Sequence, residues 1–264
     1  MAFLAVPGPF DFALTTERFR AFGVDRANVW HEGGLHRVVA GREVRIEAAP
    51  GGIEVEPLDA ETEPVAQAVA GLAFELGPFY AWAGRDPELA PLVTRLEGFR
   101  PTLTPDPFEM LVGAITAQQV SLFAALAIRN RLIERFGVHV GQAWSFPARD
   151  AIARSSEREL VSLGFSRRKA EYVLGLARAG LDLGALAPLP DDEIRARLVA
   201  LRGIGAWTAE WFLARHLARQ HAWPAGDLAL RKAVAPLQPE AARIRFHPFE
   251  NLSAHYLLLA SRVP

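Results

Sequence analysis

The carboxylate of Asp227 is the strongest candidate for a catalytic group in this sequence. Asp227 follows Gly226 and precedes the apolar run Leu228-Ala229-Leu230, so it should lie at the N-terminus of a helix. A carboxylate at such a position commonly caps the helix, and the local sequence alone favours that role. A carboxylate can also stabilise a positively charged transition state or orient an attacking water. The residues around Asp227 therefore leave a helix cap and a catalytic group as alternatives.

A turn with two glycines, Gly203-Ile204-Gly205, lies between two helical patterns upstream of Asp227. Glycine permits positive φ angles and lets the backbone approach a ligand closely. A helix that begins at Ala206 would present free N–H groups and the positive end of its dipole, which suits a phosphate. A plain helical hairpin turn remains the structural alternative. A dinucleotide-binding loop is excluded, because no strand precedes the turn and Thr208 stands at the place of the third glycine.

The composition narrows the function further. Half of the residues are hydrophobic and there is no cysteine, which excludes disulfides, thiolate zinc sites and iron–sulfur clusters and fits a reducing cytoplasm. The start of the chain does not resemble a signal peptide, and the longest apolar stretch, 256–260, is too short to span a membrane. We therefore expect a cytoplasmic protein.

The distribution of charge and of histidine adds two expectations. Residues 1–95 hold 8 Lys and Arg against 14 Asp and Glu, whereas residues 96–264 hold 21 against 16. This asymmetry fits a polyanionic partner for the second part, although two solvated surfaces of different composition would explain it as well. His216 and His221 are five residues apart and fall on different helix faces. No tight spacing of histidine and carboxylate is evident, so we expect no metal site of that kind.

The first part of the chain alternates between apolar and polar residues, as strands do. Such runs cover 35–39, 44–47 and 53–56, and helical patterns flank them near 16–22 and 63–74. These patterns predict an α+β N-terminal domain, with an antiparallel sheet and flanking helices, over residues 1–97.

After Pro101 the apolar residues recur at the spacing that is typical of helices. Asp106 is a predicted N-cap for a helix that ends near residue 117, with Pro107 at N1 and with Glu109 at N3 in a variant of the capping box. Ser121 should cap the next helix, which ends at Phe136. Gln118 and Gln119 would then lie at the junction of the two helices. Further helices are expected up to residue 164, from 166, and over 191–201, 206–219, 228–235 and 248–261, with no strand after residue 100.

The hairpin, the loop Trp223-Pro224-Ala225-Gly226 and Asp227 together resemble the helix-hairpin-helix DNA glycosylase superfamily. Residues 10–12, 106–109, 117–121 and 163–171 also match, in the right order, the 3-methyladenine DNA glycosylase II family of the AlkA type. The resemblance implies an all-α helix-hairpin-helix glycosylase core over residues 98–264. Its two helical lobes, roughly 107–222 and 223–264, would flank the active-site cleft.

The resemblance also implies a reaction. Asp227 would be the catalytic carboxylate of a base-excision repair enzyme that hydrolyses the N-glycosidic bond of bases flipped out of duplex DNA. Family members that also cut the strand carry a lysine at the position of Trp207, so a monofunctional glycosylase without lyase activity and without a cofactor is implied. Alkylated bases such as 3-methyladenine and 7-methylguanine are the expected substrates. A glycosylase for deaminated bases such as hypoxanthine or uracil, and a non-catalytic helix-hairpin-helix DNA-binding protein, remain alternatives.

Five residues are candidates for the walls of a base pocket. Trp207 and Trp211 share one helix face, and their rings could stack on a cationic base, although a core stripe is the structural alternative. Phe19 could supply another wall. Leu228 and Leu258 stand where the family often has aromatic residues, and 248–251 departs from the family's Pro-Trp-Arg-Ser, which implies a roomier pocket.

The resemblance further implies contacts to double-stranded DNA, bound by a monomer. Either Gln118 or Gln119 would fill the gap left by the flipped base, unless both are ordinary loop residues. Thr208, with the backbone of Gly203 and Gly205, would hold one phosphate. Arg168 and Lys169 would hold another, unless they form only a solvated helix start. No metal is required, although the carbonyls of Leu201 and Gly203 could hold a monovalent cation.

Overall fold

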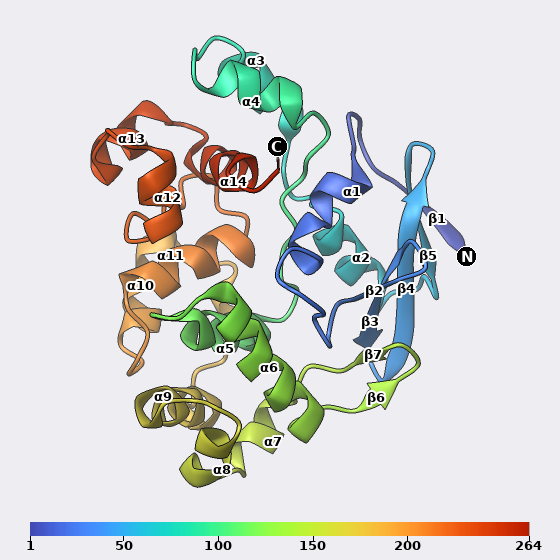
Figure 1. Ribbon diagram of the computed structural model, residues 1–264, viewed down its shortest axis with the longest axis vertical. Coiled ribbons are helices and arrows are strands. Elements are labelled where there is room, and N and C mark those ends of the chain that lie inside the picture. Colours follow the sequence, from blue (N-terminus) through green and yellow to red (C-terminus); the bar gives the residue numbers. More distant parts are fainter. Residues whose placement is uncertain (264) are drawn as a thin grey trace.

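The computed structural model describes residues 1–263 and has a sheet on one side and helices on the other (Figure 1). Five antiparallel strands form the main sheet in the order β1-β5-β4-β3-β2. Leu35 lies opposite Ile46, which in turn lies opposite Val55, so these three buried side chains form one apolar row across the sheet. The strands are β1 (Ala2–Ala5), β2 (Val29–His31), β3 (Gly34–Val39), β4 (Arg42–Ala49) and β5 (Gly52–Glu56).

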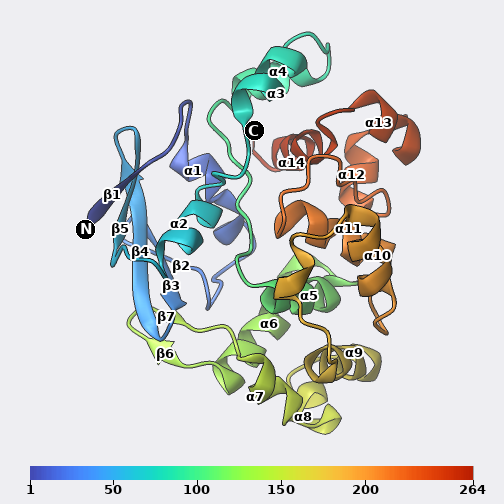
Figure 2. The same ribbon diagram turned by 180° about the vertical axis from the view of Figure 1, so that it is seen from behind.

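Short helices cover the inner face of this sheet and separate it from the helical core (Figures 1 and 2). They are α1 (Phe12–Thr15), the 3₁₀ turn η1 (Glu17–Phe19) and α2 (Glu63–Val69). Ala66 and Val69 of α2 are buried in the same cluster as the apolar row of the sheet. The predicted α+β N-terminal fold is confirmed, although its helices are shorter than the expected 16–22 and 63–74.

The rest of the chain is mainly helical, as predicted. Asp106 caps α5 by accepting a hydrogen bond from the Glu109 N–H, and Ser121 and Ser166 cap α6 and α9 in the same way. The helices are α3 (Leu76–Ala83), α4 (Leu89–Arg95), α5 (Pro107–Ala117), α6 (Leu122–Phe136), α7 (Arg149–Ala153), α8 (Glu157–Ser162), α9 (Arg167–Arg178), η2 (Gly184–Leu186), α10 (Asp191–Val199), α11 (Ala206–Arg215), α12 (Leu228–Ala233), α13 (Pro239–Arg245) and α14 (Glu250–Ala260).

Helices α3 and α4 pack with the C-terminal helices and not with the sheet. Phe79 of α3 and Leu89 of α4 share a buried cluster with Tyr256 of α14, and the Phe79 and Tyr256 rings are 4.9 Å apart. Figure 1 shows both helices beside α14. By packing, the chain therefore divides near residue 73 and not at the expected boundary after residue 97.

A two-stranded hairpin, β6 (His139–Val140) and β7 (Ala143–Trp144), contradicts the expectation of no strand after residue 100. The hairpin is tied to the N-terminal domain, because the Trp144 N–H donates to the Arg26 carbonyl at 2.8 Å. Strands of two residues are too short to produce a detectable alternation. Helix α11 also ends at Arg215, before the expected residue 219, and Ala218 then takes a positive φ of 53°.

Glu109 joins the two halves of the molecule through buried ion pairs. Its carboxylate accepts from Arg37 of β3 at 2.9 Å and from Arg129 of α6 at 2.5 Å, and Arg129 also pairs with Asp25. Glu109 therefore does not complete the capping box that its N3 position suggested. The two arginines keep this buried carboxylate compensated at the contact between sheet and helices.

Candidate active site

Asp227 is both a helix cap and part of a cavity wall, so the two roles proposed from the sequence coexist. Its Oδ1 accepts from the N–H groups of Ala229 and Leu230 at 2.9 and 3.1 Å, which caps α12. Its Oδ2 accepts from the indole Nε1–H groups of Trp207 and Trp211, both at 3.1 Å. All four contacts use the carboxylate as an acceptor, which suits its ionised form and fixes its orientation.

The glycine turn before α11 needs glycine at one position and leaves open space at the other. Gly203 has a φ of 89°, and a Cβ there would lie 2.1 Å from the ring of Tyr172. Gly205 is the N-cap of α11, and a Cβ there would meet no atom within 4 Å. Among residues 1–263 no side chain caps this helix. Its first N–H groups therefore lack a capping side chain, and the space beside Gly205 is open, as an anion site requires.

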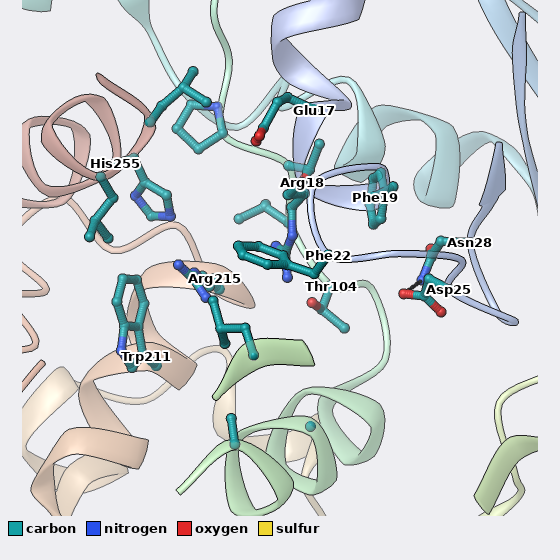
Figure 3. A pocket seen from close by; sticks show the side chains of 18 of the residues that line it. Glu17, Arg18, Phe19, Phe22, Asp25, Asn28, Thr104, Trp211, Arg215 and His255 are labelled. Atoms are coloured by element: carbon teal, nitrogen blue, oxygen red, sulfur yellow. Dashed lines mark hydrogen bonds between the residues drawn. The ribbon is translucent and has the colours of Figure 1, made fainter. Parts of the chain in front are cut away.

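A cavity of about 390 Å³ lies between η1, α5, α11 and α14, and Figure 3 shows part of its lining. Asp227 lies on its wall. The volume falls within the range of small-molecule sites. Apolar lining comes from both halves of the molecule. The residues predicted for the pocket that line this cavity are Phe19, Trp207, Trp211 and Leu258.

The Trp211 ring is not free to stack on a base in the way predicted. Only 2% of Trp211 is exposed, and the Arg215 guanidinium lies over the ring, 3.7 Å from its centre. This cation–π contact takes the place expected for a cationic base. The indole N–H groups of Trp207 and Trp211 donate hydrogen bonds to the Asp227 carboxylate and so hold it in place.

Arg18 and Arg215 reach into the cavity from opposite sides (Figure 3). Burial, and then the charge of Arg18, hold the pKa of Arg215 well below its ordinary value. Burial, and then the nearby Arg262, lower the pKa of Arg18 to about 10. Within residues 1–263 the Nε of Arg215 has no hydrogen-bond partner. The cavity therefore offers donors and positive charge close to Asp227.

His255 of α14 adds a neutral group to the same cavity. Burial, and then the Arg215 charge, lower its pKa to about 3. Its Nδ1 lies 2.9 Å from the Asn251 carbonyl and so carries the proton. The Nε2 is buried and finds no partner within the described chain. His255 can therefore accept a hydrogen bond from a molecule in the cavity.

The prediction that Leu228 lines the pocket is wrong. Leu228 is 71% exposed and lies instead in a separate surface depression with Arg231, Lys232 and Pro236. As the first residue of α12 it points outward, since the capping carboxylate of Asp227 points inward. Ala229, one residue further, lines the cavity in its place.

Gln118 and Gln119 have different places at the junction of α5 and α6. Gln118 donates from Nε2 to the Gly203 carbonyl at 2.9 Å and to the Thr208 hydroxyl at 3.3 Å, so it braces the glycine turn. Gln119 is exposed and has a positive φ of 56°. Of the two, Gln119 is the one with an exposed side chain.

Two side chains predicted to hold phosphates are buried. Thr208 is only 1% exposed and accepts from Gln118, so its hydroxyl cannot reach a phosphate. Lys169 is also buried, and its Nζ donates to the Thr116 carbonyl at 2.8 Å, at the C-terminus of α5. A lysine there compensates the negative end of the helix dipole. Arg168 is exposed, as a phosphate contact requires.

The backbone carbonyls named for a monovalent cation already accept hydrogen bonds. The Leu201 carbonyl accepts from the Ile204 N–H at 3.1 Å, and the Gly203 carbonyl accepts from Gln118. A carbonyl oxygen has a second lone pair, so the cation stays a prediction.

Three residues that line the cavity were not predicted from the sequence: Arg18, Arg215 and His255. Arg215 had a usable signal, because positions 207, 211 and 215 continue one helix face at intervals of four residues. Arg18 and His255 are separated from it by long stretches of chain, and only the fold brings them together.

Comparisons with known proteins agree with this geometry. The family described as HhH-GPD superfamily base excision DNA repair protein matches residues 112–244, half of the chain, including the glycine turn and Asp227. With its helical core, glycine turn and spaced aspartate, the chain belongs to this superfamily.

Two curated relatives have names that give an activity. The chain is 31% identical over 172 residues to a DNA-3-methyladenine glycosylase of Bacillus subtilis, and the aligned part covers 62% of this chain and 57% of that protein. It is 30% identical over 212 residues to a probable bifunctional transcriptional activator and DNA repair enzyme AlkA of Mycobacterium tuberculosis, covering 76% of this chain and 40% of that protein. The chain thus spans about half the length of the curated relatives it matches.

Solved structures extend the likeness to the whole chain. A 3-methyladenine DNA glycosylase from Archaeoglobus fulgidus superposes with a TM-score of 0.88 at 27% identity, over 99% of this chain and 98% of that one. An 8-oxoguanine glycosylase/lyase of Clostridium acetobutylicum, in complex with double-stranded DNA, shares the fold with a TM-score of 0.80 at 20% identity, over 96% and 92% of the two chains.

No helix among the described residues has the length and apolar character needed to cross a membrane.

Proposed function

We propose that the protein is a DNA glycosylase of base-excision repair that hydrolyses the N-glycosidic bond of alkylated bases, with Asp227 as its catalytic carboxylate. One observation carries the proposal: an aspartate held by four N–H donors lies on the wall of a cavity of about 390 Å³, which is large enough to admit a single base. The names of the similar proteins from Bacillus subtilis and Archaeoglobus fulgidus support alkylated bases as the substrate.

The carboxylate would act on the sugar. When the N-glycosidic bond breaks, the bonding electrons leave with the base and positive charge develops on the sugar. Asp227 stabilises that charge, and a water adds to the anomeric carbon and loses one proton, either to the departing base or, when a cationic base leaves as a neutral molecule, to solvent water. Because donors hold both carboxylate oxygens, electrostatic stabilisation suits this geometry better than proton abstraction.

The proposed enzyme has no lyase activity. Strand cleavage of the kind used by bifunctional glycosylases needs an amine that forms a Schiff base with the sugar. The chain has two lysines, Lys169 and Lys232, and neither lines the cavity. Lys169 is bonded to Thr116, and Lys232 is exposed on α12. Borohydride should therefore trap no covalent adduct with lesion DNA, and a trapped adduct would contradict this assignment.

The proposed DNA contacts place the duplex across the glycine turn and the α5–α6 junction. The open N-terminus of α11, with Gly203 and Gly205, would hold a phosphate, Arg168 would hold another, and Gln119 would fill the gap left by the flipped base. Such contacts predict salt-sensitive binding with little sequence preference, by a monomer.

A second candidate function, release of deaminated bases, is favoured by the arginines of the cavity. Arg215 covers the Trp211 ring and Arg18 adds a second positive charge, so a cationic base would be repelled there. Hypoxanthine and uracil are uncharged and carry carbonyl oxygens that can accept from a guanidinium. Relative release rates of these bases and of 7-methylguanine separate the two candidates.

The test is a release assay on duplexes that each contain one modified base, with 3-methyladenine, 7-methylguanine, hypoxanthine and uracil in the panel. Wild-type protein should release at least one of them, and Asp227→Asn should release almost none while still binding the duplex. Asp150→Asn, at an exposed position on α7 outside the cavity, is the matched control. If wild type releases no base from any duplex, the protein is a DNA-binding protein without this activity.

A further inference from the structure

Three side chains outside the base cavity converge at the junction of α13 and α14. They are His221 from the segment after α11, His247 from the turn before α14, and Glu250 at the start of α14. His221 Nδ1 lies 3.0 Å from Glu250 Oε2, and His247 Nδ1 lies 3.1 Å from Glu250 Oε1. The expectation of no closely spaced histidine and carboxylate is wrong here, because His247 and Glu250 are three residues apart.

The burial of these groups is uneven. The Glu250 side chain is 1% exposed, whereas the side chains of His221 and His247 are 53% and 64% exposed. Among the described residues no Arg or Lys forms an ion pair with Glu250, and the nearby Arg243 pairs with Glu240. A buried carboxylate usually has a cation or several donors beside it. Here its side-chain partners are two imidazoles, whose Nδ1 atoms lie within hydrogen-bonding distance of its two oxygens.

The donor set suits a particular class of cation. Two imidazole nitrogens and one carboxylate oxygen are ligands of zinc and of other late first-row divalent metals, not of calcium or magnesium. The N–O separations of 3.0 and 3.1 Å are close to the ~3.3 Å edge of a tetrahedron with metal–ligand bonds of ~2.0 Å. All three donor atoms lie within 4.8 Å of one another. The exposed rings leave room for water in the remaining coordination position.

We propose that His221, His247 and Glu250 form a binding site for one zinc-class divalent cation. A cation there would supply the positive charge that the buried Glu250 carboxylate otherwise lacks as a partner. It would also join the segment that leads from α11 toward Asp227 to the N-terminus of α14. The site is separate from the base cavity, which none of the three residues lines, and it does not depend on the proposed function.

The experiment titrates zinc into the untagged full chain after chelator treatment, by calorimetry, and repeats the titration with Co²⁺, whose visible spectrum reports nitrogen and oxygen ligands. His221→Ala and His247→Ala are the test variants, because both side chains are exposed and their loss should not unfold the protein. His31→Ala, on β2 and also exposed, is the matched control.

Wild type and His31→Ala should bind one equivalent of zinc with equal affinity, and zinc should raise their melting temperatures. Each test variant should bind at least ~10-fold more weakly, because it lacks one ligand. The proposal is overturned if wild type binds no stoichiometric zinc at micromolar concentrations. Equal affinity of His247→Ala, His221→Ala and His31→Ala would also overturn it.

Discussion

Replacing Trp207 by Phe removes a single indole N–H from Asp227 and keeps an aromatic ring at the cavity wall. The bond removed is the 3.1 Å contact from Nε1 to Oδ2. Trp211 donates to the same oxygen at the same distance and remains in the variant. The change therefore tests whether the indole donors hold the carboxylate in its working orientation.

The magnitude follows from the strength of such bonds. A hydrogen bond to a charged group contributes about 1.5–3 kcal/mol, which corresponds to a rate loss of about 10- to 150-fold if the bond is needed in the transition state. Because Trp211 still holds the oxygen, we expect Trp207→Phe near the lower end, about 10-fold. Trp207→Phe with Trp211→Phe should lose more than the sum of the single changes and approach Asp227→Asn.

The assay is single-turnover release of the best lesion base, with duplex affinity and melting temperature measured alongside. Trp144→Phe, on the β6–β7 hairpin, is the control, because its ring packs against His139 and lies outside the cavity. It should retain the wild-type rate. A folded Trp207→Phe protein that releases base within twofold of wild type would refute the positioning role of the indoles.

Three further predictions concern the glycine turn, Gln119 and His255. Gly205→Ala should keep the stability of wild type but bind DNA at least several-fold more weakly in a salt titration, because the added methyl group would crowd the proposed anion site. Gly203→Ala should instead destabilise the fold by more than ~1 kcal/mol, and an unchanged DNA affinity of Gly205→Ala would contradict the anion site. Gln119→Gly keeps a residue that tolerates the positive φ and removes the side chain that would fill the gap left by the flipped base. It should slow base release ~10-fold or more when the lesion is paired, and less when the lesion is mispaired. An equal effect on both duplexes would contradict this gap-filling role of Gln119. Below pH 6.5 the unfolded chain protonates His255, whereas the folded chain, with a pKa of about 3 for this residue, does not. In urea unfolding, wild type should therefore lose about 1.2 kcal/mol more than His255→Gln between pH 7 and pH 5.5, and parallel losses would contradict neutral burial.

Local chemistry is what made the helical core predictable. The caps at Asp106 and Ser121 were predicted because a capping side chain bonds its own helix within three residues. Long-range packing was not predictable in this way. The carboxylate of Glu109, which looked like part of a capping box, is taken by Arg37 and Arg129 from distant segments.

In the candidate site, too, locally encoded features were predictable and features that depend on long-range packing were not. Asp227 was found through the glycine turn and its spacing, which are local features. Leu228 was misplaced because one residue at a helix start decides whether a side chain points inward, and that depends on the cap geometry. The positive charge of the cavity comes from Arg18 and Arg215, which lie in different halves of the chain, so no single segment carries its signature.

The central claim is that the Asp227 carboxylate drives base release, and single-turnover release from the lesion duplexes tests it most directly. The account predicts that wild type and Asp150→Asn release base at the same rate. Asp227→Asn, which keeps the side-chain shape and removes the charge, should be slower by at least ~100-fold while it binds the duplex with similar affinity. Release by folded Asp227→Asn at a rate near that of wild type would contradict the account.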